Sequence, residues 1–278
     1  MGNKFLEELV IGKTDINLPR TRKEQFRKVL RDNFFTLIKY SLFITLFVLP
    51  YIVNQIVYSY TITALSDMKE IFVYLYRKCF ADIFLILIIS VPVSGISYII
   101  RKRVWSDQLN NEGILDGIKK QLRRFILIFL IIGVSVFIFN TGSYYYLYLY
   151  QGYDIVGNVL LSVSLVQLVF VLIVSFYMIT MDTRYNLKIR DLLMNSIKLG
   201  VKYLFRNILV LLTIMMPLIV VYFVSAPYQI VIFIIIAPIY YSMALLLVFE
   251  YTAYIYDETV NKDKYPEIYK KGLDTKSL

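Results

Sequence analysis

The stretch that decides the fold of this chain is residues 81–100, ADIFLILIISVPVSGISYII, which is followed at once by RKR at 101–103. Twenty consecutive, predominantly apolar residues are the length that an α-helix needs to cross the hydrocarbon core of a bilayer. Three cations directly after such a run mark its cytoplasmic end, because loops rich in Lys and Arg stay on that side. The stretch therefore predicts a membrane-spanning helix that ends in the cytoplasm.

Five more runs of this kind occur along the 278 residues, of which 58% are hydrophobic. Together they predict an all-α, polytopic membrane bundle of six transmembrane helices arranged as three hairpins. The chain then divides into a basic segment (1–33), a transmembrane domain (34–256) and a polar tail (257–278). The expected spans are 34–57, 81–100, 125–145, 156–181, 208–224 and 230–249.

The distribution of Lys and Arg predicts the orientation. Of the 30 such residues, 26 lie before the first expected span, in the second and fourth connections, or in the tail. Only Lys69, Arg77 and Lys78 lie in the other connections, and Lys39 lies within a span. This split predicts that both termini are cytoplasmic. The formal net charge of +10 then indicates a lipid bilayer with anionic headgroups as the partner, and we expect no nucleic acid partner.

A basic amphipathic stretch precedes the first, third and fifth expected spans, at 21–33, 108–124 and 188–204. In each, apolar residues recur at helical spacing and Lys or Arg residues lie on the other side, which is typical of helices that lie on a membrane surface. Two interpretations stay open. The chain contains three related units of surface helix, span and return span, or it shows the ordinary pattern of any even-numbered bundle with cytoplasmic loops.

The residue types present leave little room for catalysis. The chain has no His and a single Cys, Cys79, which excludes an internal disulfide and a metal site or catalytic dyad built on these residues. We therefore expect no cofactor and no metal. The carboxylates nearest to apolar depth are Asp82, Asp182 and Glu250, all at expected span ends, where a charge costs less than at the bilayer centre. Lys78 lies one helical turn before Asp82, so a local ion pair accounts for that carboxylate.

Gln167 is the clearest polar residue inside an expected span, and Ser162, Ser164 and Ser175 lie on the same helix. Such residues form hydrogen bonds between helices or line the path of a substrate. We favour hydrogen bonding, because transport paths usually carry ionisable residues or broken helices.

The connection from 140 to 158 contains six Tyr residues and no Lys or Arg. Tyr is enriched where a membrane protein meets the lipid headgroups, so an aromatic belt is the favoured interpretation. The alternative is that these rings stack on sugars, since Asn140, Gln151 and Asp154 lie nearby.

An acid and an arginine lie together after the fourth expected span, directly before the third amphipathic stretch. One interpretation is a salt-bridged elbow between Asp182 and Arg184 that fixes the surface helix. The other is a surface that binds a cytoplasmic partner through complementary charge, and this is our hypothesis. The candidate docking residues are Asp182, Arg184, Lys188, Arg190, Asp191, Asn195 and Lys198.

Several short motifs resemble the YesL-like family of bacterial membrane proteins. They are RYNLK at 184–188, LLMNS at 192–196, DNFF at 32–35 and a span that closes on Leu49-Pro50, together with the basic stretch 113–124. The family has no established biochemical activity, and its members are commonly encoded beside carbohydrate ABC importers. The resemblance implies a bacterial plasma-membrane protein with an accessory role in sugar uptake and ABC transporter subunits as partners.

Three functions are thus considered. The first is a non-enzymatic accessory protein that binds or regulates a carbohydrate ABC importer. The second is a permease or channel that acts by itself on a small solute. The third is an intramembrane enzyme, which the missing His and the positions of the carboxylates disfavour.

Overall fold

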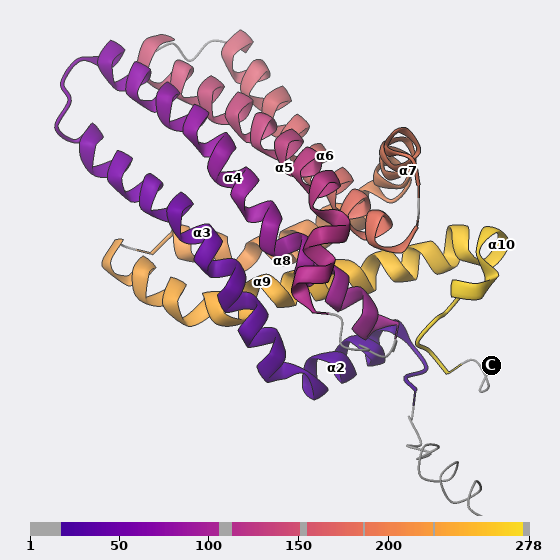
Figure 1. Cartoon of the computed structure of the whole chain (residues 1–278). Helices are drawn as coiled ribbons and strands as arrows, with labels where there is room; N and C mark the ends of the chain where they lie inside the picture. Colours follow the sequence, from indigo (N-terminus) through magenta and orange to yellow (C-terminus); the bar gives the residue numbers. More distant parts are fainter. Residues whose placement is uncertain (1–17, 106–112, 151–154, 186, 225, 275–278) are drawn as a thin grey trace, which may run out of the picture.

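The computed structural model describes residues 18–105, 113–150, 155–185, 187–224 and 226–274. The regular structure in these ranges is entirely helical, as the sequence predicts (Figure 1). The long helices are α3 (Phe34–Ile62), α4 (Met68–Val104), α5 (Ile114–Tyr144), α6 (Ile155–Arg184), α8 (Leu204–Tyr222) and α9 (Ala226–Tyr256). The shorter elements are α2 (Arg22–Asp32), the π-helical η1 (Tyr145–Tyr150), α7 (Ile189–Lys202), the π-helical η2 (Asp257–Asn261), α10 (Lys262–Lys264) and the 3₁₀-helical η3 (Pro266–Ile268).

Five helical segments are long and apolar enough to cross a bilayer, and four of them begin with α3, α4, α5 and α6. The fifth runs from Val231 in α9 to Lys264. Helices α7 and α8 pass the same test as a pair, bent by 93°, and that pair is the sixth candidate span. The chain is therefore a membrane-embedded helical bundle.

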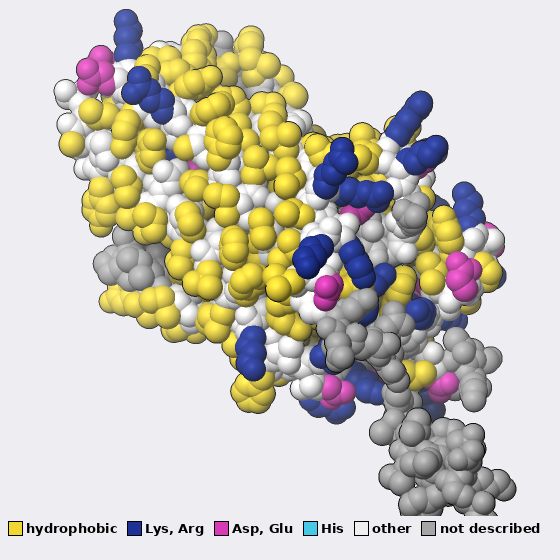
Figure 2. Space-filling model, in the orientation of Figure 1, with side chains coloured by type: hydrophobic (Ala, Val, Ile, Leu, Met, Phe, Trp, Pro, Cys, Tyr) yellow, Lys and Arg dark blue, Asp and Glu magenta, His cyan; other side chains and the backbone are white. Residues whose placement is uncertain are grey.

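Charge is unevenly distributed over the surface. Figure 2 shows apolar side chains over most of this face of the bundle, whereas Lys and Arg gather where α2, α7 and α10 lie, with a few charged side chains at the opposite tip. We call the cationic region the basic end. It comprises α2, the last turn of α4 (101–104), the junction between α6 and α7, and residues 257–274.

Helix α4 is the central element. The buried share of its most apolar 18-residue window is 61%, against 17–28% in the other four segments. Its neighbour α5 approaches closely because both helices have a glycine at the contact. A Cβ added to Gly117 would lie 2.7 Å from Tyr98 Cβ and 2.9 Å from the carbonyl oxygen of Gly95. Small residues at such contacts let helices pack tightly in membranes.

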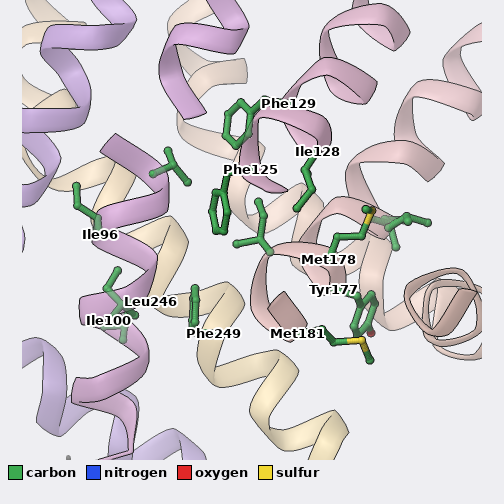
Figure 3. Packing of buried hydrophobic residues seen from close by; sticks show 14 of the residues in the cluster. Ile96, Ile100, Phe125, Ile128, Phe129, Tyr177, Met178, Met181, Leu246 and Phe249 are labelled. Atoms are coloured by element: carbon green, nitrogen blue, oxygen red, sulfur yellow. The ribbon is translucent and has the colours of Figure 1, made fainter. Parts of the chain in front are cut away.

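The buried core lies where these two helices meet α6 and α9. It draws side chains from all four helices (Figure 3). Its labelled members are Ile96, Ile100, Phe125, Ile128, Phe129, Tyr177, Met178, Met181, Leu246 and Phe249.

The first connection differs from the expectation of a loop at 58–80. Helix α3 continues to Ile62 and α4 begins at Met68, so most of this stretch is helical. The stretch contains neither Gly nor Pro, and the break between the two helices is confined to 63–67. Asp67 then caps α4, since its side-chain oxygen accepts a hydrogen bond from the Lys69 amide at 3.1 Å.

The amphipathic stretch expected at 108–124 is not a separate helix in its described part. Residues from Ile114 onward form the first turns of α5, which continues unbroken into the span. No Gly or Pro lies near the Arg124–Phe125 junction to end the helix there. The other two amphipathic helices are separate as predicted: α2 ends before Asn33, and α7 ends before Tyr203.

Candidate functional site

Helix α7 carries most of the predicted docking residues and is held firmly against the bundle. Its buried side consists of Leu192, Ser196, Leu199 and Gly200. The turn into α8 is closed by Asn207, whose side-chain amide donates to the Gly200 carbonyl at 3.0 Å. The Asn207 side-chain oxygen accepts bonds of 2.7 Å from the hydroxyls of Tyr177 in α6 and Tyr251 in α9. Asn207 of α8 therefore ties the end of α7 to α6 and α9.

The elbow before α7 has partners other than those predicted. Asp182 forms an ion pair with Arg124 of α5 at 2.7 Å, and its side chain is only 2% exposed. Arg184 instead donates to the Phe249 carbonyl at 2.7 Å and lies over the rings of Phe249 and Tyr256. The expected pair between Asp182 and Arg184 is wrong because residues two apart on a helix do not face each other. Both side chains hold the elbow to the bundle, Asp182 through α5 and Arg184 through α9.

The remaining docking candidates divide into two groups. Lys188, Asp191 and Lys198 are exposed and Asn195 is half-buried, and we call these four residues the docking face. Arg190 is exposed too, but it lies elsewhere on the helix. Its neighbours at three, four and seven positions along α7 are the apolar residues Leu193, Met194 and Ile197, of which the first two are exposed.

A buried ion pair joins the two ends of the chain at the basic end. Arg22 of α2 pairs with Asp257 of η2 at 2.6 Å, and both side chains are 9% exposed. Arg22 also donates to Gln25 at 2.5 Å and to the Lys271 carbonyl at 3.1 Å. Gln25 in turn donates to the Gly272 carbonyl at 3.1 Å and to the Val104 carbonyl at the end of α4. The expected polar tail is thus, from Asp257 to residue 274, a folded part of the basic end.

The same network reaches the elbow. The Tyr185 hydroxyl donates to the side-chain oxygen of Asn261 at 2.6 Å. The Asn261 amide donates to Asp257 at 2.8 Å, and the Lys270 backbone amide does so at 3.1 Å. Burial raises the pKa of the Tyr185 phenol above its usual value, so the hydroxyl stays protonated and acts as a donor. Sequence reasoning missed this network because its members are up to 249 residues apart.

Glu250 has an unusual position within the network. Its side chain is buried, with 4% of the residue exposed. Neither carboxylate oxygen has a hydrogen-bond partner among the residues that the structure describes. Arg22 and Arg184 are close enough to attract the carboxylate. The side chain is thus enclosed by protein, and its position near a span end stays a prediction.

A second ionic cluster lies inside the bundle, away from the basic end. The predicted pair between Lys78 and Asp82 is confirmed at 3.3 Å. Asn54 donates to Asp82 at 2.9 Å, and Gln55 donates to both carboxylate oxygens at 3.0 and 3.1 Å. We call these four residues the intramembrane cluster.

Asp82 is enclosed by the bundle. The side chains of Lys78 and Asp82 are 5% and 2% exposed. Asp82 lies fourteen residues inside α4, which begins at Met68, or about 21 Å along the helix axis. The signal available in the sequence was Asn54-Gln55, two amides in an otherwise apolar run after Pro50.

Gln167 forms the interhelical hydrogen bond that the favoured interpretation requires. Its amide donates to the Ser135 hydroxyl of α5 at 2.9 Å. Ser162, Ser164 and Ser175 bond to backbone carbonyls of their own helix. In the Tyr-rich connection the rings of η1 contact one another, edge-on between Tyr145 and Tyr146 and stacked between Tyr145 and Tyr150. Tyr153 lies outside the described residues, and the choice between aromatic belt and sugar stacking stays a prediction.

Across the described ranges, no group of three His, Cys, Asp or Glu side chains is arranged to hold a metal ion. Cys79 is a buried free thiol. Comparison of the chain with protein-family models, curated proteins and solved structures finds no significant match. The YesL-like resemblance therefore rests only on the short motifs named above, at 32–35, 49–50, 113–124, 184–188 and 192–196.

Proposed function

We propose that this protein is a non-enzymatic membrane accessory protein that binds a cytoplasmic partner through the docking face of α7. The observation that supports this most is the contrast between the two sides of that helix. Its inner side is fixed by Asn207 and by the anchored elbow, whereas Lys188, Asp191 and Lys198 are exposed. A rigid charged face loses little conformational freedom on binding and selects a partner by charge.

The proposal includes an orientation. In it, the protein lies in a bacterial plasma membrane with both termini and the basic end in the cytoplasm, as the distribution of Lys and Arg favours. Reporter fusions after Lys202 and Lys262 should then be cytoplasmic, and a fusion at Tyr150 should be external. A cytoplasmic Tyr150 would contradict both the orientation and the assignment of six spans.

The partner class in this proposal is a carbohydrate ABC importer, which the YesL-like motifs imply. The docking face offers exposed charges of both signs, which suits a protein contact better than turnover. The alternative is that these cations only attract anionic lipid, at about 1 kcal/mol each. Binding of a specific protein depends on the position of each charge on the docking face, whereas attraction of anionic lipid depends on their sum.

The decisive experiment exchanges two charges without changing their sum. Lys188→Glu combined with Asp191→Lys reverses the charge pattern of the docking face but leaves the net charge unaltered. Co-purification of importer subunits from native membranes should fall at least about tenfold, because like charges placed opposite each other cost several kcal/mol. Anionic-lipid binding should not change. The matched control exchanges two exposed residues at the opposite end, Lys69→Glu with Glu70→Lys. Equal recovery of the partner from both variants would contradict the proposal.

A transport function is the second candidate, and the intramembrane cluster is the observation that favours it. Buried ionisable residues within a span are by default candidates for a solute or proton path. Reconstituted vesicles should then show solute flux that Asp82→Asn abolishes. Absence of flux for a panel of sugars and ions, with a folded protein in the vesicles, would leave the accessory role as the better account.

A further inference from the structure

A cavity of about 230 Å³ lies beside α7, and two residues of the docking face, Asn195 and Lys198, form part of its lining. It is formed between α7, the end of α6 and the folded C-terminal segment, which lie near one another in Figure 1. One wall is apolar and aromatic, and it includes Met181, Leu199 and the rings of Tyr185 and Tyr265. The two rings lie 5.0 Å apart between centroids.

The other wall is cationic. Lys198 and Lys202 come from α7, and Lys264 comes from α10. All three are exposed, and none forms an ion pair with another described residue. The Lys202 ammonium lies 5.4 Å from the centroid of the Tyr203 ring. A contact with a neutral ring does not neutralise its positive charge.

This arrangement costs free energy in the absence of an anion. Lys198 and Lys202 are four residues apart, so they lie side by side on the helix and repel each other. Lys264 adds a third positive charge across the cavity. None of the described residues that line the cavity is an Asp or Glu that could balance them. A bound anion with several oxygens would offset the repulsion of all three ammonium groups.

We propose that this cavity is a binding site for a phosphate group, with Lys198, Lys202 and Lys264 as the ligands of the phosphate oxygens. Three ammonium groups form charge-assisted hydrogen bonds with a phosphate, which is among the strongest contacts available to lysine. The apolar wall and the two tyrosine rings give the rest of a phosphorylated molecule a surface to pack on. The site goes beyond the proposed partner contact and does not depend on it.

The phosphate can belong to a soluble compound or to a lipid headgroup, and helix geometry favours the soluble source. Successive residues are about 100° apart around a helix. The cavity residues Asn195, Lys198 and Lys202 therefore lie on one side of α7. The exposed apolar residues Leu193 and Val201 lie roughly opposite and are the ones suited to face lipid. The cavity then opens toward water.

The test measures thermal stability with two probes. The full-length protein is placed in nanodiscs of phosphatidylcholine alone or with phosphatidylglycerol, with or without sodium pyrophosphate, at matched ionic strength. Binding stabilises the folded state by mass action, so a probe that occupies the site raises Tm. We expect pyrophosphate to raise Tm in phosphatidylcholine discs. A rise with phosphatidylglycerol that removes any further effect of pyrophosphate would assign the site to a lipid headgroup.

The variant that tests the assignment is Lys202→Gln with Lys264→Gln, which keeps the docking face intact. It should bind the effective probe about tenfold more weakly or worse, because each charge-assisted bond contributes about one to two orders of magnitude. The control, Lys119→Gln with Lys262→Gln, removes two exposed charges outside the cavity and should bind like the wild type. Equal Tm shifts in the two variants, or no shift with either probe, would overturn the proposal. Neither result bears on the exchange of Lys188 and Asp191, so the two proposals fail separately.

Discussion

The two buried ionic groups of this protein differ in how completely their charges are satisfied. In the intramembrane cluster, Asp82 accepts hydrogen bonds from Asn54, Gln55 and Lys78. At the basic end, Asp257 is equally well bonded to Arg22. Glu250 has no hydrogen bond to either of its oxygens within the described part of the chain. A buried carboxyl group is thus a structural tie in two places and lacks a hydrogen-bond partner in a third.

This difference teaches where the bundle depends on a charge. A buried ion contributes to stability when partners replace the water it lost, and removing one partner exposes the desolvation cost of the other. A buried carboxylate without such partners contributes little to stability. Replacing it with a neutral group of the same shape should therefore cost little free energy. Substitutions of the three carboxylates should therefore have very different effects.

The largest effect is expected at Asp82. Asp82→Asn keeps the shape and an acceptor oxygen for Asn54 and Gln55 but leaves the Lys78 ammonium uncompensated. The free energy of unfolding should fall by about 3–5 kcal/mol. It is measured by circular dichroism as sodium dodecyl sulfate is titrated into neutral micelles.

A second substitution serves as the control for this prediction. Lys78→Met combined with Asp82→Asn removes both charges, so most of the lost stability should return. If the double variant is as unstable as the single one, the shape and packing at position 82 matter and the ion pair does not.

A smaller effect is expected at Asp257. Asp257→Asn removes the charge partner of Arg22, which keeps its bonds to Gln25 and the Lys271 carbonyl. The loss should be about 1.5–3 kcal/mol, the value of a hydrogen bond to a charged group. Trypsin should cleave after Lys270 or Lys271 faster than in the wild type, as the C-terminal segment detaches from α2.

The control is the exposed pair of Arg206 and Glu258, 3.9 Å apart with side chains 59% and 42% exposed. Glu258→Gln should change stability by less than about 1 kcal/mol and leave trypsin cleavage unchanged. A C-terminal segment that resists trypsin in Asp257→Asn would show that its apolar contacts hold it without the ion pair.

Tyr185→Phe tests the outer part of the same network. It deletes the hydroxyl that donates to Asn261 at 2.6 Å and leaves a buried amide oxygen without that donor. The cost should be about 1 kcal/mol, detected as a lower Tm. Tyr60→Phe alters a ring that is exposed and should leave Tm unchanged. If both substitutions have the same effect, the Tyr185 hydroxyl has no structural role.

The sequence predicted the features that depend on local pattern. The helical bundle follows from apolar runs such as 81–100, and the ion pair of Lys78 with Asp82 follows from their spacing of one turn. The sequence also predicted that Gln167 forms a hydrogen bond between helices, although it did not indicate the partner residue. Helix length was predicted less well. The mixed charge of the stretch from 58 to 80 indicated a loop, but the stretch contains neither Gly nor Pro and is mostly helical.

Contacts between distant segments could not be predicted. Arg22 looked like one of many cations on a surface helix, and nothing near it in sequence indicates Asp257, which is 235 residues away. One interpretation paired Asp182 with its neighbour Arg184, whereas its partner Arg124 lies on another helix. Such pairs are set by how helices pack, which composition and spacing do not specify.

The smallest effect is expected at Glu250. The two cations that attract it have other partners, since Arg22 pairs with Asp257 and Arg184 donates a hydrogen bond to the Phe249 carbonyl. Glu250→Gln therefore breaks no hydrogen bond seen among the described residues and removes a charge whose burial costs free energy. The free energy of unfolding should change by less than about 1 kcal/mol, in the same titration that shows a large loss for Asp82→Asn. A loss near 3 kcal/mol would mean that Arg22 and Arg184 depend on the Glu250 carboxylate despite their other partners. The comparison between satisfied and unsatisfied charges would then be wrong, because all three buried carboxylates would be structural ties of equal weight.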